Sequence, residues 1–216
     1  MINKFTESNF KAICDNLAAK DADLKRVIDT YGYPPIWSRP NNFDSLVHII
    51  LEQQVSLASA LAALNKLRER VQEITPARVL LLTDEEFKAC HCSRQKTAYI
   101  KYLAEAIVNG EINLGHFEQM PDDGIRTKLT ALKGIGNWTV DIYLMFVLHR
   151  SDYYPIGDLA QVNALKRLKS LSASTPREEL IAIAERWSPY RTVASMILWH
   201  FYLSSPRKKT QGDPSS

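Results

Sequence analysis

Cysteine is scarce in this sequence, and its few copies are poorly placed for cross-linking. The three cysteines, Cys14, Cys90 and Cys92, do not form the disulfide framework that stabilises small secreted domains. Cys90 and Cys92 flank His91, which invites a metal site. However, zinc usually takes four ligands, and no second pair of Cys or His residues lies nearby in the sequence. We therefore expect an ordinary helix-to-loop segment at this trio.

Long apolar runs are also missing. No stretch approaches the roughly 20 apolar residues that span a bilayer, and the first ten residues lack the apolar core of a signal peptide. We therefore expect no membrane partner. The expected location is the cytoplasm, associated with the nucleoid, if the protein is bacterial, and the nucleus if it is eukaryotic.

The sequence has no large excess of charge of either sign. Lys and Arg number 27 and Asp and Glu number 24, which gives a formal net charge of +3. This balance permits a nucleic-acid partner but does not by itself indicate one. Apolar residues make up 45% of the chain, a value typical of globular proteins rather than disordered ones.

Strand-like alternation is absent, and the apolar pattern is helical nearly throughout. Apolar residues recur at three-, four- and seven-residue steps, as on one helix face, first from residue 43 and again from residue 99. These positions are Leu46, Ile50, Leu57, Leu61 and Leu64, then Tyr99, Leu103 and Ile107. The expected fold is all-α.

Proline and composition suggest the domain organisation. Pro34-Pro35 and Arg39-Pro40 predict a rigid extended link after an N-terminal helical region. We expect one unit over residues 1–205, with one lobe at about 43–130 and a second formed by about 1–42 plus 131–205. Residues 206–216 are polar and are expected to be a mobile tail, whose basic run is either a solvated end or a DNA arm.

The most informative segment is Leu132-Lys-Gly-Ile-Gly-Asn-Trp-Thr139, between two helical patterns. Gly134 and Gly136 flank Ile135, which would anchor a tight turn in the core. Glycine allows positive φ and close approach of a ligand to the backbone. Amides at the start of the next helix could then bind a DNA phosphate. A simple packing turn between helices is the alternative interpretation.

Asp158 follows the loop Tyr154-Pro-Ile-Gly157 and precedes a helical run from Leu159 to Leu168. This position predicts an N-cap aspartate, whose side chain accepts an amide of the helix. A helix N-terminus also favours an ionised carboxylate, which is the form that could stabilise a cationic sugar. Capping and catalysis are compatible, so the position leaves both open.

These segments resemble the helix-hairpin-helix superfamily of DNA glycosylases with a Gly/Pro-rich loop and an aspartate (HhH-GPD). The resemblance is strongest to the 3-methyladenine DNA glycosylase II (AlkA-type) enzymes. It rests on the hairpin, on the Asp158 loop and on two further segments, in the family's order between Phe43 and about Phe201. The further segments are Ile50-Leu-Glu-Gln-Gln-Val-Ser56 and Ala184-Glu-Arg-Trp-Ser-Pro-Tyr-Arg191.

The resemblance implies a two-lobed helical glycosylase without the N-terminal sheet domain that some relatives carry. The implied activity is hydrolysis of the N-glycosidic bond of alkylated purines in base excision repair, by base flipping, with Asp158 as the catalytic carboxylate. Bifunctional relatives place a lysine just after the hairpin glycines. Trp138 occupies that position here, so the resemblance implies no lyase activity.

The resemblance also implies roles for residues around this centre. Trp138, Tyr143 and Trp37 would line the base pocket, although Ile142 rather than Tyr143 occupies the position of a relative's pocket aromatic. The alternative is that Trp138 is a core residue and that Trp37 only packs in the Pro-rich link. Gln54 would fill the gap left by the flipped base, or else be a solvated helix glutamine. Phosphates would contact the hairpin amides of Gly134, Gly136 and Trp138. Ser93, Arg94 and Lys96 would either cap and decorate a helix or add one phosphate contact.

The expected partner is double-stranded DNA that contains damaged bases, bound by a monomer. No cofactor is expected apart from a possible structural Na⁺ or K⁺ at the carbonyls of Leu132 and Ile135. Two alternatives remain at this point. One is a glycosylase for another lesion class, such as ethenoadenine, hypoxanthine or an oxidised purine. The other is a non-catalytic helix-hairpin-helix DNA-binding protein, which would have no use for Asp158.

Overall fold

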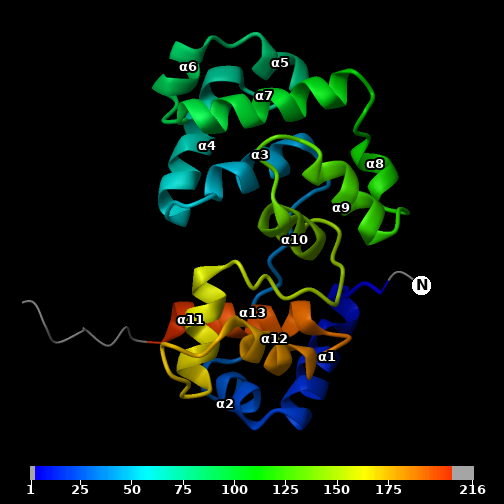
Figure 1. Cartoon of the computed structure of the whole chain (residues 1–216), viewed down its shortest axis with the longest axis vertical. Helices are drawn as coiled ribbons and strands as arrows, with labels where there is room; N and C mark the ends of the chain where they lie inside the picture. The colour runs from blue at the N-terminus through cyan, green and yellow to red at the C-terminus, as the bar shows by residue number, and fades with distance from the viewer. Residues whose placement is uncertain (1–2, 206–216) are drawn as a thin grey trace, which may run out of the picture. The chain divides into compact units, whose positions relative to one another are not determined.

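The structure, a computed structural model, describes residues 3–205 and is all-α over that range (Figure 1). Thirteen helices are present in these residues, and the β-structure among them is an isolated bridge between Lys4 and Arg150. The expected all-α fold is thus confirmed. The expected tail at 206–216 lies outside the described residues. The chain divides into two compact units, each described below by itself.

The first unit comprises residues 3–6 and 37–155 of the described chain. Its long central helix α7 packs against α5, α6 and α3, and α3 in turn packs against α4 and α10. Its helices are α3 (Phe43–Glu52), α4 (Leu57–Val71), α5 (Pro76–Leu80), α6 (Asp84–Ala89), α7 (Arg94–Val108), α8 (Leu114–Phe117), α9 (Asp122–Thr130) and α10 (Asn137–Phe146).

The apolar pattern that starts at residue 43 belongs to two helices rather than to one face. The backbone leaves the helix after Glu52, and Gln54 takes a positive φ of 57°. A new helix then begins at Leu57, with Ser56 as its side-chain cap. Leu57 and Leu61, expected on the buried face, are exposed. The helical periodicity is therefore interrupted by a turn that shifts α4 out of phase with α3.

The second unit comprises residues 7–36 and 156–205 of the described chain. Its helices are α1 (Glu7–Lys20), α2 (Ala22–Tyr31), α11 (Leu159–Leu168), α12 (Arg177–Glu185) and α13 (Arg191–Ser204). Helix α13 packs against α1, α2 and α11. It forms the centre of this unit because every residue from Thr192 to Leu198 is buried.

The Asp21 carboxylate joins three segments of the second unit. It caps α2 by accepting the backbone N–H groups of Asp23 and Leu24. The Nζ atom of Lys169 lies 2.6 and 2.7 Å from its two oxygens, and the indole Nε1 of Trp187 donates to it at 2.9 Å. The buried Trp187 thereby gains a partner for its N–H, which would otherwise be costly to bury.

The boundary between the units differs from the division expected from the sequence. Residues 131–155, placed in the second lobe by the sequence interpretation, belong to the first unit, as do residues 37–42. The physical reason is packing, because α10 contacts α9 and α3 of the first unit. The glycine turn therefore lies within the first unit, whereas Asp158 lies in the second.

Candidate nucleic-acid interface and catalytic carboxylate

The turn between α9 and α10 has the geometry that its two glycines predict. Gly134 has a φ of +92°, and the N–H of Ile135 donates to the carbonyl of Leu132 at 3.1 Å. The Ile135 side chain is buried and anchors the turn in the core. Gly136 is the N-cap of α10, with φ −99° and ψ 178°.

Gly134 is required for two independent reasons. Its positive φ is a conformation that side chains with a Cβ rarely adopt. In addition, a Cβ at this position would lie 2.0 Å from Cγ of the Tyr99 ring, far inside van der Waals contact. At Gly136, by contrast, a Cβ would meet no atom within 4 Å. The aromatic ring of Tyr99 therefore packs directly on the turn backbone.

The N-terminus of α10 has no side-chain cap. Elsewhere in the same unit, Asn42, Ser56 and Ser93 cap α3, α4 and α7 with side-chain oxygens. A capping side chain normally satisfies amides of the first helical turn. This helix end instead presents its first turn beside the exposed Gly136, which suits an external anion.

Arg126 fixes the first turn of α10 from the neighbouring helix α9. Its guanidinium donates to Oδ1 of Asn137 at 3.0 Å and to Oδ1 of Asp141 at 2.6 Å. Burial raises the pKa of Asp141, and the pairing with Arg126 lowers it only in part. The two residues lie four apart on one helix face, so one cation holds both and stiffens the turn that carries Trp138.

The turn between α3 and α4 is bonded to the glycine hairpin. We call residues 53–56 the wedge turn. The side-chain Nε2 of Gln53 donates to the carbonyl of Gly134 at 2.9 Å and to Oγ1 of Thr139 at 3.0 Å. Gln54, the next residue, has an exposed side chain. The structure thus brings Gln54 and the hairpin together within the first unit.

The three expected pocket aromatics lie in different surroundings. Trp138, in the first turn of α10, and Trp37, in the extended link, are each partly exposed. Tyr143 is fully buried, with its hydroxyl donating to Oδ1 of Asn41 at 2.7 Å and its ring edge-on to Phe117. Burial raises the pKa of the Tyr143 hydroxyl. The expectation that this ring lines an open pocket is corrected, because its hydroxyl and ring are used inside the core.

Ser93, Arg94 and Lys96 stand at the start of α7. Ser93 caps the helix by accepting the N–H of Lys96, and Arg94 is exposed. The ammonium of Lys96 donates to the carbonyl of Leu51 at 2.6 Å, and burial lowers its pKa. A cation at the C-terminal end of α3 complements the partial negative charge there. Of the three, Arg94 has the position best suited to an external phosphate.

Asp158 is the N-cap of α11, as its place after the Pro/Gly loop predicts. Its Oδ1 accepts the N–H of Gln161 at 2.9 Å, with an extended backbone at φ −86° and ψ 115°. The side chain is neither fully buried nor fully exposed. The arrangement holds a carboxylate in one orientation at a helix N-terminus, where negative charge is favoured.

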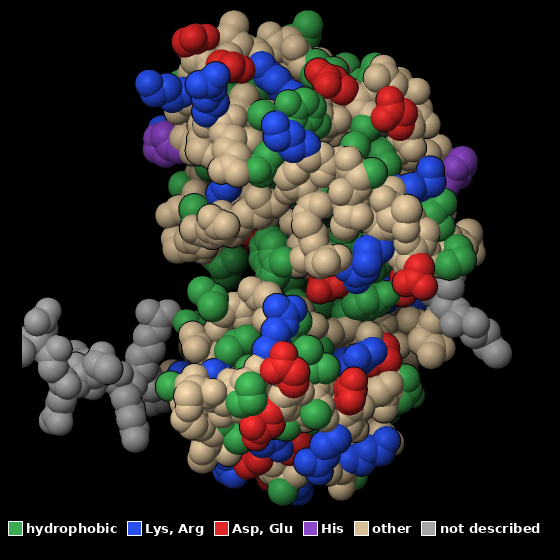
Figure 2. Space-filling model, viewed as in Figure 1, with side chains coloured by type: hydrophobic (Ala, Val, Ile, Leu, Met, Phe, Trp, Pro, Cys, Tyr) green, Lys and Arg blue, Asp and Glu red, His purple; other side chains and the backbone are tan. Residues whose placement is uncertain are grey.

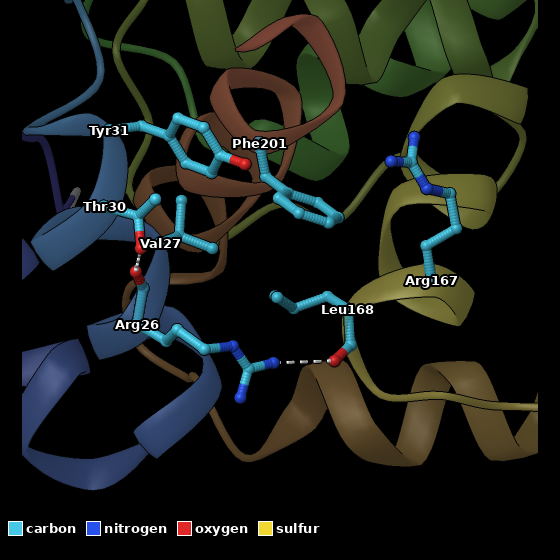
Figure 3. Close-up of a pocket in the computed structure, with 7 residues that line it drawn as sticks. All are labelled: Arg26, Val27, Thr30, Tyr31, Arg167, Leu168 and Phe201. Carbon is cyan, nitrogen blue, oxygen red and sulfur yellow. Dashed lines mark hydrogen bonds between the residues drawn. The ribbon is translucent and has the colours of Figure 1, made fainter. Parts of the chain in front are cut away.

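A pocket of about 260 Å³ lies in the second unit (Figure 3). It is lined by residues near the C-terminal ends of α2, α11 and α13. These residues are Arg26, Val27, Thr30, Tyr31, Arg167, Leu168 and Phe201. Arg26 donates to the carbonyl of Leu168, and Arg167 donates to Ser205 and stacks on Phe201. Because Asp158 begins α11 and the pocket lies at its other end, this cavity is not part of the candidate site.

One face of the described chain carries charges of both signs. On the face drawn in Figure 2, Lys and Arg side chains are interspersed with Asp and Glu. This agrees with the small net charge of +3. None of the helices described for residues 3–205 is long and apolar enough to cross a membrane.

Sequence reasoning did not identify Gln53, Thr139, Tyr99 or Arg126 as parts of this site. Gln53 adjoins Gln54 in the resemblance segment, so its neighbourhood was a signal. Tyr99 and Arg126 gave none, because their contacts to Gly134 and Asn137 join helices that are separate in the sequence.

Comparison with known proteins identifies the class that this fold and site define. Residues 47–189 match the family model described as HhH-GPD superfamily base excision DNA repair protein. This match covers more than half of the chain, so the chain belongs to that superfamily.

Similar relatives carry related names. The chain is 29% identical over 191 residues to DNA-3-methyladenine glycosylase 1 of Schizosaccharomyces pombe, covering 85% of this chain and 84% of the relative. The structure of the S. pombe 3-methyladenine DNA glycosylase in complex with abasic DNA has a TM-score of 0.80, with 28% identity, and covers 87% of this chain and 95% of that one. A DNA-3-methyladenine glycosidase from Bacillus halodurans has a TM-score of 0.73 and 30% identity, with 89% of each chain covered.

Proposed function

We propose that this protein is a monofunctional DNA glycosylase that releases alkylated purines, of the 3-methyladenine and 7-methylguanine type, from double-stranded DNA. The observation that carries the proposal is Asp158, an accessible carboxylate fixed at a helix N-terminus after a Pro/Gly loop, in a chain of the HhH-GPD superfamily. The names of the similar proteins support the substrate class. The protein acts as a monomer, as the family resemblance suggests.

The first unit provides the contacts with the DNA backbone. The uncapped N-terminus of α10 and the exposed Gly136 suit a backbone phosphate, because helix N-terminal amides bind anions without a charged side chain. Arg94 is exposed at the start of α7 and adds a second phosphate contact. These contacts position the duplex and carry no sequence information.

A base inside a duplex is out of reach, so the enzyme flips the damaged nucleotide out of the stack. Gln54 fills the gap that the base leaves. Its side chain is exposed and sits at the break between two helices, where the backbone turns sharply. Unstacking costs a few kcal/mol, and alkylated bases pair less well, so this step already favours damaged sites.

Recognition of the flipped base falls to partly exposed aromatics of the first unit. Trp138 and Trp37 offer faces that attract a cation by about 0.5–2 kcal/mol. Purines alkylated at N3 or N7 carry a positive charge, whereas normal purines do not. Tyr143 does not contact the base but holds α10, the helix that carries Trp138, because its buried ring and its hydrogen bond to Asn41 fix α10 in the core.

In the chemical step, the bond between C1′ and the base nitrogen breaks, and the base leaves with the electron pair. The carboxylate of Asp158 stabilises the oxocarbenium-like sugar and orients a water molecule, whose oxygen then bonds to C1′ while its proton is released. No amine attacks C1′, because Trp138 stands where bifunctional relatives have lysine.

A monovalent cation is compatible with the hairpin but is not needed for the chemistry. The carbonyl of Leu132 already accepts the N–H of Ile135, and a carbonyl oxygen has a second lone pair. The carbonyls of Leu132 and Ile135 would hold Na⁺ or K⁺, which would brace the turn electrostatically.

The test is release of 3-methyladenine and 7-methylguanine from methylated duplex DNA by the wild type, Asp158→Asn and the control Asp123→Asn. Asp123 is an exposed carboxylate in the first turn of α9 and should be dispensable. Release by the wild type and control alone would support both the activity and the role of Asp158. Retained release by Asp158→Asn would overturn that role.

Three further readouts separate the alternatives. Borohydride trapping of a protein–DNA adduct by the wild type would contradict monofunctional chemistry. Release of ethenoadenine or hypoxanthine without methylpurines would move the protein to another lesion class. DNA binding without release of any base would favour a non-catalytic binding protein.

A further inference from the structure

Gln54 is held in an uncommon backbone conformation. Its φ of 57° lies in the left-handed region, which non-glycine residues rarely adopt and which persists only where the surroundings enforce it. The flanking helices α3 and α4 end and begin within three residues of it. The contacts of the residues next to Gln54 therefore determine where its exposed side chain points.

Leu51 and Glu52, which precede the wedge turn, are each held by a contact with another segment. The carbonyl of Leu51 accepts the ammonium of Lys96 at 2.6 Å. The buried carboxylate of Glu52 is bound by both terminal nitrogens of Arg39, at 3.0 and 2.6 Å. These two contacts anchor the end of α3 to α7 and to the extended link. They leave the wedge turn itself to be positioned by Gln53.

Gln53 makes the contact that joins the wedge turn to the hairpin. Its single NH₂ group donates both of its hydrogens, one to the carbonyl of Gly134 and one to the hydroxyl of Thr139. Thr139 is almost fully buried in the first turn of α10. One side chain thus spans the glycine turn and the helix whose N-terminus is proposed to bind phosphate.

We infer that Gln53 is a positioning residue that makes the wedge turn and the phosphate-binding hairpin a single rigid body. A phosphate held by the hairpin then sets the depth at which Gln54 enters the base stack. This inference rests on the proposed function for the role of Gln54. Without the hydrogen bonds of Gln53, phosphate binding would persist, but the side chain of Gln54 would no longer be held in the orientation that enters the base stack.

The test measures binding to two duplexes of one sequence, one undamaged and one with a tetrahydrofuran abasic analogue. The variants are Gln54→Ala, Gln53→Ala, their double variant and the control Gln72→Ala. Gln72 is also exposed, at the end of a helix, with a positive φ of 63°, so it matches the backbone setting of Gln54. Each binding curve is recorded by fluorescence anisotropy, with urea unfolding to confirm that the variant is folded.

We expect Gln54→Ala and Gln53→Ala each to weaken binding to abasic DNA about tenfold, and the double variant to be within about twofold of either. Binding to undamaged DNA should stay within about twofold for all variants. A purely structural role of Gln53 would instead weaken both duplexes equally. Thr139→Val, which removes one acceptor at nearly constant volume, should give an intermediate loss and serves if Gln53→Ala does not fold.

The inference is overturned if Gln53→Ala binds abasic DNA as tightly as the wild type does. It is also overturned if the affinity of the double variant falls by the product of the two single-variant factors. If Gln72→Ala binds the abasic and the undamaged duplex with equal affinity, the inference is also overturned. Because base release plays no part in this measurement, its outcome is separable from the proposed reaction. If the effects of Gln53→Ala and Gln54→Ala are non-additive but the protein releases no methylpurine, only the proposed reaction is overturned. If release depends on Asp158 but the two effects are additive, only the inference about Gln53 is overturned.

Discussion

Oδ1 of Asp158 accepts the backbone N–H of Gln161 at 2.9 Å. The same carboxylate that is proposed to act on the sugar therefore closes the first turn of α11. Gln161 is itself fully buried, and its side-chain amide donates to the carbonyl of Ser195 at 2.8 Å on α13. The orientation of Asp158 is thus tied to the core of the second unit.

Because asparagine caps helices about as well as aspartate, catalysis and capping at position 158 are separable. We expect Asp158→Asn to keep the free energy of unfolding within about 0.5 kcal/mol of the wild type, and Asp158→Ala to lower it by about 1 kcal/mol. Both should lose base release. Urea unfolding followed by circular dichroism, beside the release assay, checks this. A strongly destabilised Asp158→Asn would mean that the ionised form itself supports the fold.

Trp138→Leu should weaken the preference for cationic lesions. Loss of a cation–aromatic contact worth about 0.5–2 kcal/mol predicts a fall of roughly 2- to 30-fold in single-turnover release of 7-methylguanine. Release of any neutral lesion that the enzyme accepts should change less. Tyr102→Leu, at an exposed aromatic of α7 in the same unit, serves as the control. Equal losses for charged and neutral lesions would indicate that Trp138 is a packing residue only.

The two hairpin glycines should respond differently to alanine. Gly134→Ala meets the Tyr99 ring and an unfavourable positive φ, so a loss of at least about 2 kcal/mol in unfolding free energy is expected. Gly136→Ala has open space around its Cβ and an ordinary φ of −99°, so it should fold normally. If a phosphate approaches this turn, Gly136→Ala should nevertheless bind DNA more weakly. Thermal unfolding and DNA titration distinguish the two effects.

Asp21 predicts a pH dependence of stability. Burial alone would raise its pKa, but the hydrogen bonds from Lys169 and Trp187 outweigh it and lower the pKa below the ordinary 3.8. A carboxyl with a lowered folded-state pKa contributes stability that is fully present above its unfolded pKa. This contribution is lost as the pH falls through the folded value.

We therefore expect Asp21→Asn to cost about 2 kcal/mol at pH 7, because the ammonium of Lys169 loses its shorter ion pair and keeps only Asp23, at 3.0 Å, as a charged partner. The difference from the wild type should shrink below about pH 4, where the Asp21 carboxyl of the unfolded chain takes up a proton before that of the folded protein. Urea unfolding at pH 7 and pH 3 measures this. Asp29→Asn, on the same helix in an exposed pair with Lys25, should have little effect at either pH. A constant difference across this range would contradict the assignment.

Local features of the site were predictable because they depend on residues close together in the sequence. Two glycines around one apolar residue predicted the turn with Gly134 at positive φ. A Pro/Gly loop before a helical run predicted Asp158 as an N-cap. Helical periodicity predicted the all-α fold, since it reports which face of a segment is apolar.

Long-range partners were not predictable. From the sequence, Lys96 suits either a phosphate contact or an ordinary helix surface, whereas in the structure its ammonium donates to the carbonyl of Leu51. Tyr143 reads as a pocket aromatic and is buried against Asn41 and Phe117. In each case the chemistry of the side chain suits either a contact with DNA or a contact inside the protein. Only the residues around it in the folded structure determine which contact it makes.

The sequence by itself determined the helices, the glycine turn and the capping aspartate, because propensity, periodicity and glycine's freedom act over a few residues. Only the tertiary structure decided that the periodic run from residue 43 breaks at Gln54, and that the hairpin belongs to the first unit. It also decided that Gln53 joins the wedge turn to Gly134, which lies 81 residues away in the chain. Such contacts depend on how helices pack, and packing is set by the whole core rather than by any one segment.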